Sequence, residues 1–327
     1  MKTFKDIIGH DNIKEHFKAA LESGKISHAY IFSGEEGSGK KTVADIFAAA
    51  LMCGGEEKPC GGCMSCMQAE SRNHPDIIYV THEKSRMSVE EIRTQIVEDI
   101  IIRPFNGGRK VYIVDEADRM TEQAQNALLK TIEEPPEYAV IILLTANTGA
   151  FLQTILSRCV TLQFKPLGNQ LISEYLMKNE GLPDYYAGVC ASFSGGSLGR
   201  AIRYAKNAEF EQTKAEVLGF VKNIDESSFD AIMNIVARLS ERKEALDDYL
   251  DLMHLWFRDV LMFKATQDVN RIIFIDETMA IRKMAARYSF EGLGRISEAF
   301  GKVRDRLRAN VNFDTAMQLL LLSMRDH

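Results

Sequence analysis

The sequence lacks any run of about 18 apolar residues, which is the length that a membrane-spanning helix needs. It also lacks the pattern of a secretory signal. The N-terminal segment MKTFKDIIGHDNIKEHF carries a charge every few positions and has no continuous apolar core. These absences argue against a membrane protein and against export through such a signal, so we expect a cytoplasmic protein without a membrane partner.

An excess of positive charge is missing as well. The 327 residues hold 40 Lys and Arg against 46 Asp and Glu, a formal net charge of -6. Such a chain is not attracted as a whole to the phosphate backbone of nucleic acid. Contact with DNA is therefore expected to be shared with partner proteins, unless a local basic patch exists.

Cysteine is scarce except in one short segment. Four of the six cysteines lie between positions 53 and 66, with the spacing C-x6-C-x2-C-x2-C among glycines. A reducing cytosol disfavours disulfides, whereas four thiolates at this spacing can surround a tetrahedral ion. We predict a structural Zn2+ site held by Cys53, Cys60, Cys63 and Cys66, with four reduced thiols as the alternative. Four sulfur ligands leave no position for a substrate water.

Short apolar runs bounded by turn residues alternate with helical patterns in the first half of the chain. They are Ala29–Phe32, Ile77–Val80, Val111–Val114, Val140–Leu144 and Val160–Phe164. This alternation predicts an α/β domain over residues 1–166, with a mostly parallel sheet covered by helices. One helix is marked by a capping box from Ser88 to Glu91 and by a stripe of isoleucines. The stripe is Ile92, Ile96 and Ile100.

Strand signals fade after residue 166. Residues 167–207 read as short helices interrupted by turn residues, which predicts a small helical lid. Helical periodicity dominates beyond that point, so we expect residues 208–327 to form an all-α domain. Its best-marked helix places seven apolar residues on one face: Leu246, Tyr249, Leu250, Met253, Phe257, Val260 and Leu261.

A glycine-rich segment, GEEGSGK at 34–40, follows a predicted strand and opens a predicted helix. In this context such a loop wraps phosphate oxygens with its backbone N–H groups. We therefore predict contacts to ATP or ADP from Gly34, Gly37, Ser38 and Gly39. The ammonium of Lys40 would lie against the β- and γ-phosphates. The alternative is a tight turn that binds no ligand.

The position after this lysine departs from a working phosphate loop, which has Ser or Thr there to ligate magnesium. Here the position is occupied by Lys41, and a hydroxyl comes one residue later, at Thr42. One residue turns a helix by about 100 degrees, so Thr42 should point away from the metal. We expect impaired Mg2+ binding, and weak or absent hydrolysis by this chain alone.

Two carboxylates stand at the end of the third apolar run. Asp115 and Glu116 follow the strand predicted at Val111–Val114 and should lie at the sheet edge that also carries the phosphate loop. In a site that hydrolyses nucleotide, Asp115 would hold magnesium and Glu116 would polarise water. The pair makes a nucleotide-binding fold more specific than the loop alone does.

Several motifs resemble the clamp-loader subunits of bacterial DNA polymerase III, which are AAA+ proteins. The resemblance rests on HAYIF at 28–32, the cysteine quartet, QNALLKTIEEPP at 125–136 and LSRC at 156–159. It covers roughly residues 4 to 200 and continues more loosely in ANVNF at 309–313. It implies an AAA+ P-loop domain with a zinc-binding insertion, a helical lid and a C-terminal helical collar that assembles with other subunits.

The resemblance also implies roles for three residues. Arg158 would be an arginine finger, reaching the γ-phosphate held by a neighbouring motor subunit. A surface salt bridge is the alternative for a lone arginine. Asn147 matches a sensor position near the phosphate, and Arg200 matches a second sensor on the lid. The alternatives for these two are a turn asparagine and a lid-capping arginine.

The family further implies partners and a task. The partners are motor subunits and delta in a hetero-pentamer that loads a sliding clamp onto primed DNA during replication. Lys41 favours a subunit with an altered phosphate loop over the ATP-hydrolysing motor subunit, which is the alternative. Nothing in the chain resembles a polymerase or exonuclease site, so its own enzymatic activity stays open although the holoenzyme is a nucleotidyltransferase.

Two further classes compete with this interpretation. One is a pure scaffold that binds no nucleotide. The other is a zinc-dependent nucleic-acid binder, which the cysteine-only ligand set and the acidic charge disfavour.

Overall fold

The computed structural model describes residues 2–82, 85–105, 108–207, 209–309 and 311–325. The chain divides into two compact units. The first is Met1–Tyr175 with Ser194–Arg200, and the second is Leu176–Phe193 with Ala201–His327. The segment expected to form a lid contributes to both units, and the three-domain division at residues 166 and 207 stays a prediction.

The first unit is built on a five-stranded sheet in which all strand pairs are parallel. The strands are β1 Ala29–Ser33, β2 Ile77–Val80, β3 Lys110–Val114, β4 Ala139–Thr145 and β5 Val160–Gln163, in the order β2-β3-β4-β1-β5. The predicted parallel α/β sheet is confirmed, and no strand end differs from its expected place by more than one residue. β1 and β3, which precede the phosphate loop and the acidic pair, are separated by β4.

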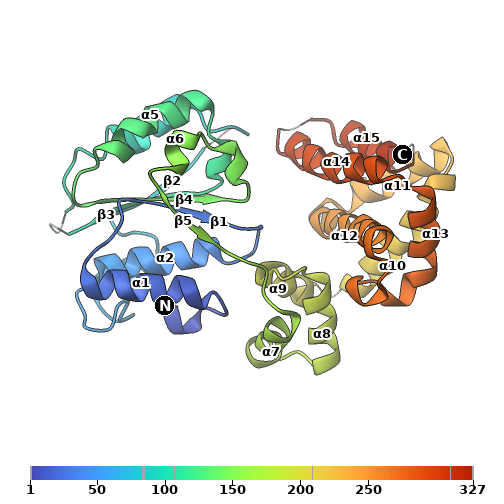
Figure 1. The fold of residues 1–327 in the computed structure, drawn as a ribbon, viewed down its shortest axis with the longest axis horizontal. Coiled ribbons are helices and arrows are strands. Elements are labelled where there is room, and N and C mark those ends of the chain that lie inside the picture. Colours follow the sequence, from blue (N-terminus) through green and yellow to red (C-terminus); the bar gives the residue numbers. More distant parts are fainter. Residues whose placement is uncertain (1, 83–84, 106–107, 208, 310, 326–327) are drawn as a thin grey trace. The chain divides into compact units, whose positions relative to one another are not determined.

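Helices cover both faces of this sheet (Figure 1). They are η1 Phe4–Asp6, α1 Asp11–Ser23, α2 Lys40–Met52, α3 Met64–Glu70, α4 Val89–Ile92, η2 Arg93–Val97, η3 Ala117–Arg119, α5 Glu122–Glu133, η4 Thr148–Ala150 and α6 Gln153–Leu156. Strand side chains alternate between the faces, so Tyr30 and Phe32 pack with α1 and α2 while Ile31 packs with α4, α5 and α6. Burial on both faces explains the almost continuous apolar strands.

The isoleucine-striped helix begins where the sequence predicted. The side chain of Ser88 accepts the N–H of Glu91, and the carboxylate of Glu91 accepts the N–H of Ser88, which completes the capping box. The helix is not regular, because α4 passes after one turn into the π-helical segment η2. The predicted stripe is nevertheless buried: Ile92, Ile96 and Ile100.

The second unit is helical. Helices α7 Asn169–Glu180, α8 Asp184–Phe193 and α9 Leu198–Lys206 span the boundary region, and the rest are α10 Phe210–Val221, η5 Ile224–Glu226, α11 Phe229–Glu241, η6 Lys243–Ala245, α12 Leu246–Thr266, η7 Val269–Arg271, η8 Ile275–Glu277, α13 Thr278–Arg287, α14 Phe290–Arg308 and α15 Phe313–Arg325. No helix among the described residues has the length and apolar character needed to cross a membrane.

Helix α12 is the centre of this unit, because α10, α13 and α14 all pack against it. Of the face expected to be buried, five residues are buried and two, Leu246 and Leu261, are half-buried. Burial also extends beyond that face to Trp256 and to three aspartates. Two of them, Asp248 and Asp251, are compensated by the guanidinium of Arg203, as a buried carboxylate requires.

Candidate phosphate-binding site and metal centre

The phosphate loop connects β1 to α2, and its shape depends on glycine. The backbone of Gly37 has a φ of 74° and that of Gly39 a φ of 92°, a region that residues with a Cβ rarely adopt. Gly39 directly precedes the first turn of α2. The predicted strand–loop–helix arrangement is therefore present, with the N-terminus of α2 at the end of the loop.

The ammonium group of Lys40 folds back onto its own loop. Its Nζ donates to the carbonyl oxygens of Gly34 at 2.5 Å and Glu35 at 2.7 Å, with Oγ of Ser38 at 3.5 Å. Burial lowers the pKa of Lys40, while the charges of Asp115 and nearby glutamates oppose this effect. The carbonyl groups of the loop thus supply the lysine with acceptors of the kind that phosphate oxygens would provide.

The next lysine reaches the acidic edge of the sheet. Nζ of Lys41 lies 2.7 Å from Oδ2 of Asp115, and the other oxygen of Asp115 accepts the N–H of Glu116 at 3.1 Å. Thr42 is exposed, and no hydrogen bond of its hydroxyl is found in the described part of the chain. The cation beside Asp115 is therefore the ammonium of Lys41, the residue that the sequence predicted to impair magnesium binding.

Glu116 has an arginine and a histidine as neighbours, which sequence reasoning missed. Its Oε2 lies 3.2 Å from Nε of Arg119 and 3.4 Å from Nε2 of His82. Arg119 stands three residues later in the chain, and His82 follows the end of β2, the strand beside β3. The order of the strands could have indicated the contact with His82, because the residues that follow two neighbouring parallel strands lie at the same edge of a sheet.

Residues 194–200, a turn followed by the start of α9, lie against the phosphate loop. Oγ of Ser197 donates to the carbonyl of Glu36 at 2.9 Å, and the N–H of Gly199 donates to the carbonyl of Gly37 at 2.9 Å. A Cβ on Gly199 would come within 2.7 Å of the Gly37 Cα. The two backbones therefore approach so closely that glycine is needed on both sides.

The two predicted sensor residues occupy different surroundings. Nη1 of Arg200 lies 3.4 Å from a carboxylate oxygen of Glu35, so this arginine reaches the phosphate loop. The side-chain oxygen of Asn147 accepts the N–H of Gly149 at 2.9 Å and begins the short helix η4. The sensor roles of both residues stay predictions.

Arg158 lies just beyond α6, away from these loop contacts. Its Nη2 is 3.0 Å from Oε1 of Glu133, and its Nη1 donates to the carbonyl of Thr154 at 3.1 Å. The side chain is 40% exposed, so the guanidinium is neither buried nor enclosed. The predicted arginine finger is thus available at the surface, although it has an acidic partner in its own chain.

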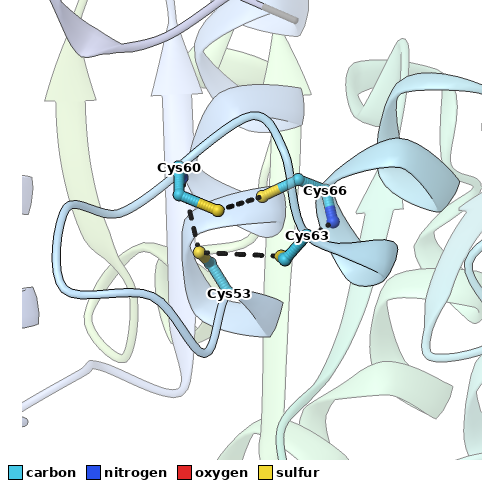
Figure 2. Close-up of side chains that lie close together, drawn as sticks. All are labelled: Cys53, Cys60, Cys63 and Cys66. Atoms are coloured by element: carbon cyan, nitrogen blue, oxygen red, sulfur yellow. Dashed lines mark hydrogen bonds between the residues drawn. The ribbon is translucent and has the colours of Figure 1, made fainter.

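The four predicted zinc ligands converge from the end of α2, the following loop and the start of α3, as Figure 2 shows. All four sulfur atoms lie within 4.8 Å of one another. The Sγ–Sγ distances are 4.0 Å for Cys60 and Cys66 and 3.9 Å for Cys53 and Cys63, too long for disulfides. A tetrahedron with Zn–S bonds of about 2.3 Å has edges of about 3.8 Å, so the cluster fits a structural zinc site.

The surroundings of the sulfurs also suit a metal. The backbone N–H groups of Gly55 and Cys60 each point to Sγ of Cys53 at 3.4 Å, as donors to a thiolate do. Hydrogen bonds from the backbone, led by that from Gly62, lower the pKa of Cys60 to about 6, whereas burial raises the pKa of Cys66 to about 12. A cation would supply the charge that lets all four thiols ionise together.

Several known proteins that resemble this chain are subunits of DNA polymerase III. The family described as "DNA polymerase III, delta subunit" matches residues 9–168. DNA polymerase III subunit delta' of Bacillus subtilis is 29% identical over 313 residues, which cover 94% of this chain and 93% of that protein. The chain is thus similar to DNA polymerase III subunit delta' over nearly the whole length of both proteins. The tau subunit of the same organism is 28% identical over 93% of this chain, but that match spans only 58% of tau.

The resemblance to DNA polymerase III subunits that the motifs indicated is thereby confirmed. The predicted α/β fold, with a parallel five-stranded sheet, a four-cysteine insertion and a helical C-terminal region, is confirmed as well. Among solved structures, a DNA polymerase III gamma subunit-related protein of Thermotoga maritima aligns with 95% of this chain and 98% of its own, at 19% identity and a TM-score of 0.47.

Proposed function

We propose that this chain is a delta-prime subunit of a DNA polymerase III clamp loader, which hydrolyses little or no ATP itself and supplies Arg158 to the ATP site of a neighbouring motor subunit. The ion pair between Lys41 and Asp115, at 2.7 Å, is the observation that carries the first part. A magnesium ion needs the aspartate and a hydroxyl beside the phosphates. Here Asp115 already pairs with a cation, the ammonium of Lys41. Lys41 also occupies the position at which a working loop has the hydroxyl.

The second carboxylate of the site supports the same proposal. A base orients water through a carboxylate oxygen, whereas Oε2 of Glu116 lies within 3.4 Å of both Arg119 and His82. The loop is still shaped to hold phosphate, so ATP or ADP binding with little hydrolysis is part of the proposal. Asn147 and Arg200 would then act as sensors of an occupant rather than in its cleavage.

The proposed assembly is a hetero-pentamer with motor subunits and delta, which loads the sliding clamp onto primed DNA. In it, the C-terminal helices would form a collar and the cysteine quartet would hold zinc as a structural ion. Arg158, exposed at the end of α6, is the group that would cross the subunit boundary. A guanidinium placed at the γ-phosphate stabilises the charge of the transition state.

The test reconstitutes the whole clamp loader with the Arg158→Ala variant and measures ATPase stimulated by DNA and clamp. We expect the variant to assemble. Its ATPase rate should fall by at least the part of the total rate that one motor subunit contributes. Arg93→Ala, which removes another exposed arginine of the same unit, should leave the rate unchanged. Unchanged ATPase in Arg158→Ala, or brisk magnesium-dependent ATPase by the purified chain, would refute the proposal.

A further inference from the structure

Glu133 meets the proposed finger at a fixed point of the fold. It is the last residue of α5, and the preceding residues Thr131 and Ile132 are buried. Its Oε1 lies 3.0 Å from Nη2 of Arg158. The carboxylate thus projects from a helix end that is anchored on the sheet, toward an arginine that lies beyond a four-residue helix.

The guanidinium has further partners on its own turn. Nη1 of Arg158 donates to the carbonyl of Thr154 at 3.1 Å and to Oγ of Ser157 at 3.2 Å. These two hydrogen bonds come from Nη1, whereas the ion pair with Glu133 lies at Nη2. The N–H of Nε and one N–H of Nη2 remain for a ligand, since no other contact of this side chain occurs within the described ranges. A phosphate group could accept both.

The pair with Glu133 does little for folding. Both side chains are almost half exposed, 40% for Arg158 and 45% for Glu133, and ion pairs at such positions contribute little to stability. An arginine side chain without a partner, in contrast, samples many rotamers. The effect of the carboxylate is therefore on the direction of the guanidinium, which it restricts before any neighbour arrives.

We propose that Glu133 is a positioning residue, which restricts the guanidinium of Arg158 before this arginine meets the phosphate bound by the neighbouring subunit. This inference rests on the proposed function of Arg158. Glu133 itself does not touch the nucleotide. It occupies one nitrogen of the guanidinium, and so reduces the ordering that the arginine must undergo during catalysis.

The experiment is a double-mutant cycle in the assembled clamp loader, using Glu133→Ala, Arg158→Ala and both together. We expect Glu133→Ala to lower kcat for ATP about threefold to tenfold with KM little changed, because orientation matters mainly in the transition state. In the Arg158→Ala background the same substitution should have no further effect. A role of Glu133 in the general structure would lower the rate equally in both backgrounds.

Glu134→Ala is the matched control, because it removes the neighbouring exposed glutamate, which makes no contact with Arg158. It should leave kcat unchanged. Glu133→Gln keeps the shape and one acceptor oxygen without the charge, so its kcat should lie between those of the parent and Glu133→Ala. If Glu133→Ala does not assemble, Glu133→Gln replaces it in the double-mutant cycle.

The outcomes separate the two proposals. If Arg158→Ala lowers the ATPase but Glu133→Ala and Glu133→Gln do not, the positioning role is wrong and the arginine finger stands. A rise in kcat for either Glu133 variant would mean that the carboxylate competes with phosphate for the arginine, which also overturns positioning. If Arg158→Ala has no effect, the proposed function fails and this inference fails with it.

Discussion

The ammonium nitrogen of Lys41 lies 2.7 Å from a carboxylate oxygen of Asp115, at the edge of the sheet where the phosphate loop and the acidic pair meet. Both side chains are nearly half exposed, so the pair contributes at most about 1 kcal/mol to folding. Its consequence is chemical. The first residue after the loop lysine neutralises the aspartate that would otherwise hold magnesium.

Replacing Lys41 by Ser should make nucleotide binding responsive to magnesium. The change frees Asp115 and places a hydroxyl directly after Lys40, as magnesium ligation requires. We expect Mg2+ to raise the affinity of Lys41→Ser for ATP about tenfold or more, but to change that of the parent little. Titration with ATP in Mg2+ and in EDTA measures both. An equal gain from Mg2+ in the parent protein would contradict the prediction.

Adding a methyl group at Gly199 should disturb the contact between the turn and the phosphate loop. Its Cβ would lie 2.7 Å from the Cα of Gly37, and backbone atoms cannot move aside as a flexible side chain can. We expect Gly199→Ala to lower the free energy of unfolding by about 1–3 kcal/mol, measured by denaturant titration. Gly168→Ala adds the same group where no atom lies within 4 Å, and should change stability by less than that.

Loss of one cysteine should release the proposed zinc ion. Cys60 is the exposed member of the quartet, so Cys60→Ser changes packing little while removing a ligand. We expect the parent protein to retain about one zinc per chain after dialysis, and the variant to retain much less and to unfold at a lower temperature. Cys159→Ser is the control outside the quartet. Equal zinc contents in Cys60→Ser and the parent would show that the quartet is not the site.

The buried His74 predicts a loss of stability on mild acidification. Burial lowers the pKa of His74, whose Nδ1 accepts the N–H of Asp76 at 3.1 Å. Protonation is therefore easier in the unfolded chain than in the folded one, so stability is present above the ordinary histidine pKa of 6.5 and is lost as pH falls below it.

His74→Asn keeps an acceptor without a titrating ring and should remove this part of the pH dependence. Between pH 7 and pH 5 we expect the parent to lose more stability than His74→Asn, measured by denaturant titration at each pH. His254→Asn, which replaces an exposed histidine, should behave like the parent. Parallel pH profiles for the parent and His74→Asn would contradict the assignment.

Much of the fold could be predicted from sequence because its signals are local. The five strands are short apolar runs between turn residues, and the isoleucine stripe follows a capping box that begins at Ser88. The extent to which α12 is buried could not be predicted from local sequence patterns. One face was expected to be buried, but three other helices surround α12, and a helical pattern does not show how many neighbours a helix has.

The sequence by itself determined the phosphate loop, the cysteine quartet, the displaced hydroxyl at Thr42 and the acidic pair after β3, since each depends on residue types at fixed short spacings. Tertiary structure alone decided that Lys41 meets Asp115, 74 residues away, and that Glu133 meets Arg158. The physical reason is that an ion pair depends on distance in space. The order of parallel strands and the packing of helix ends set that distance, and no local pattern of residues encodes it.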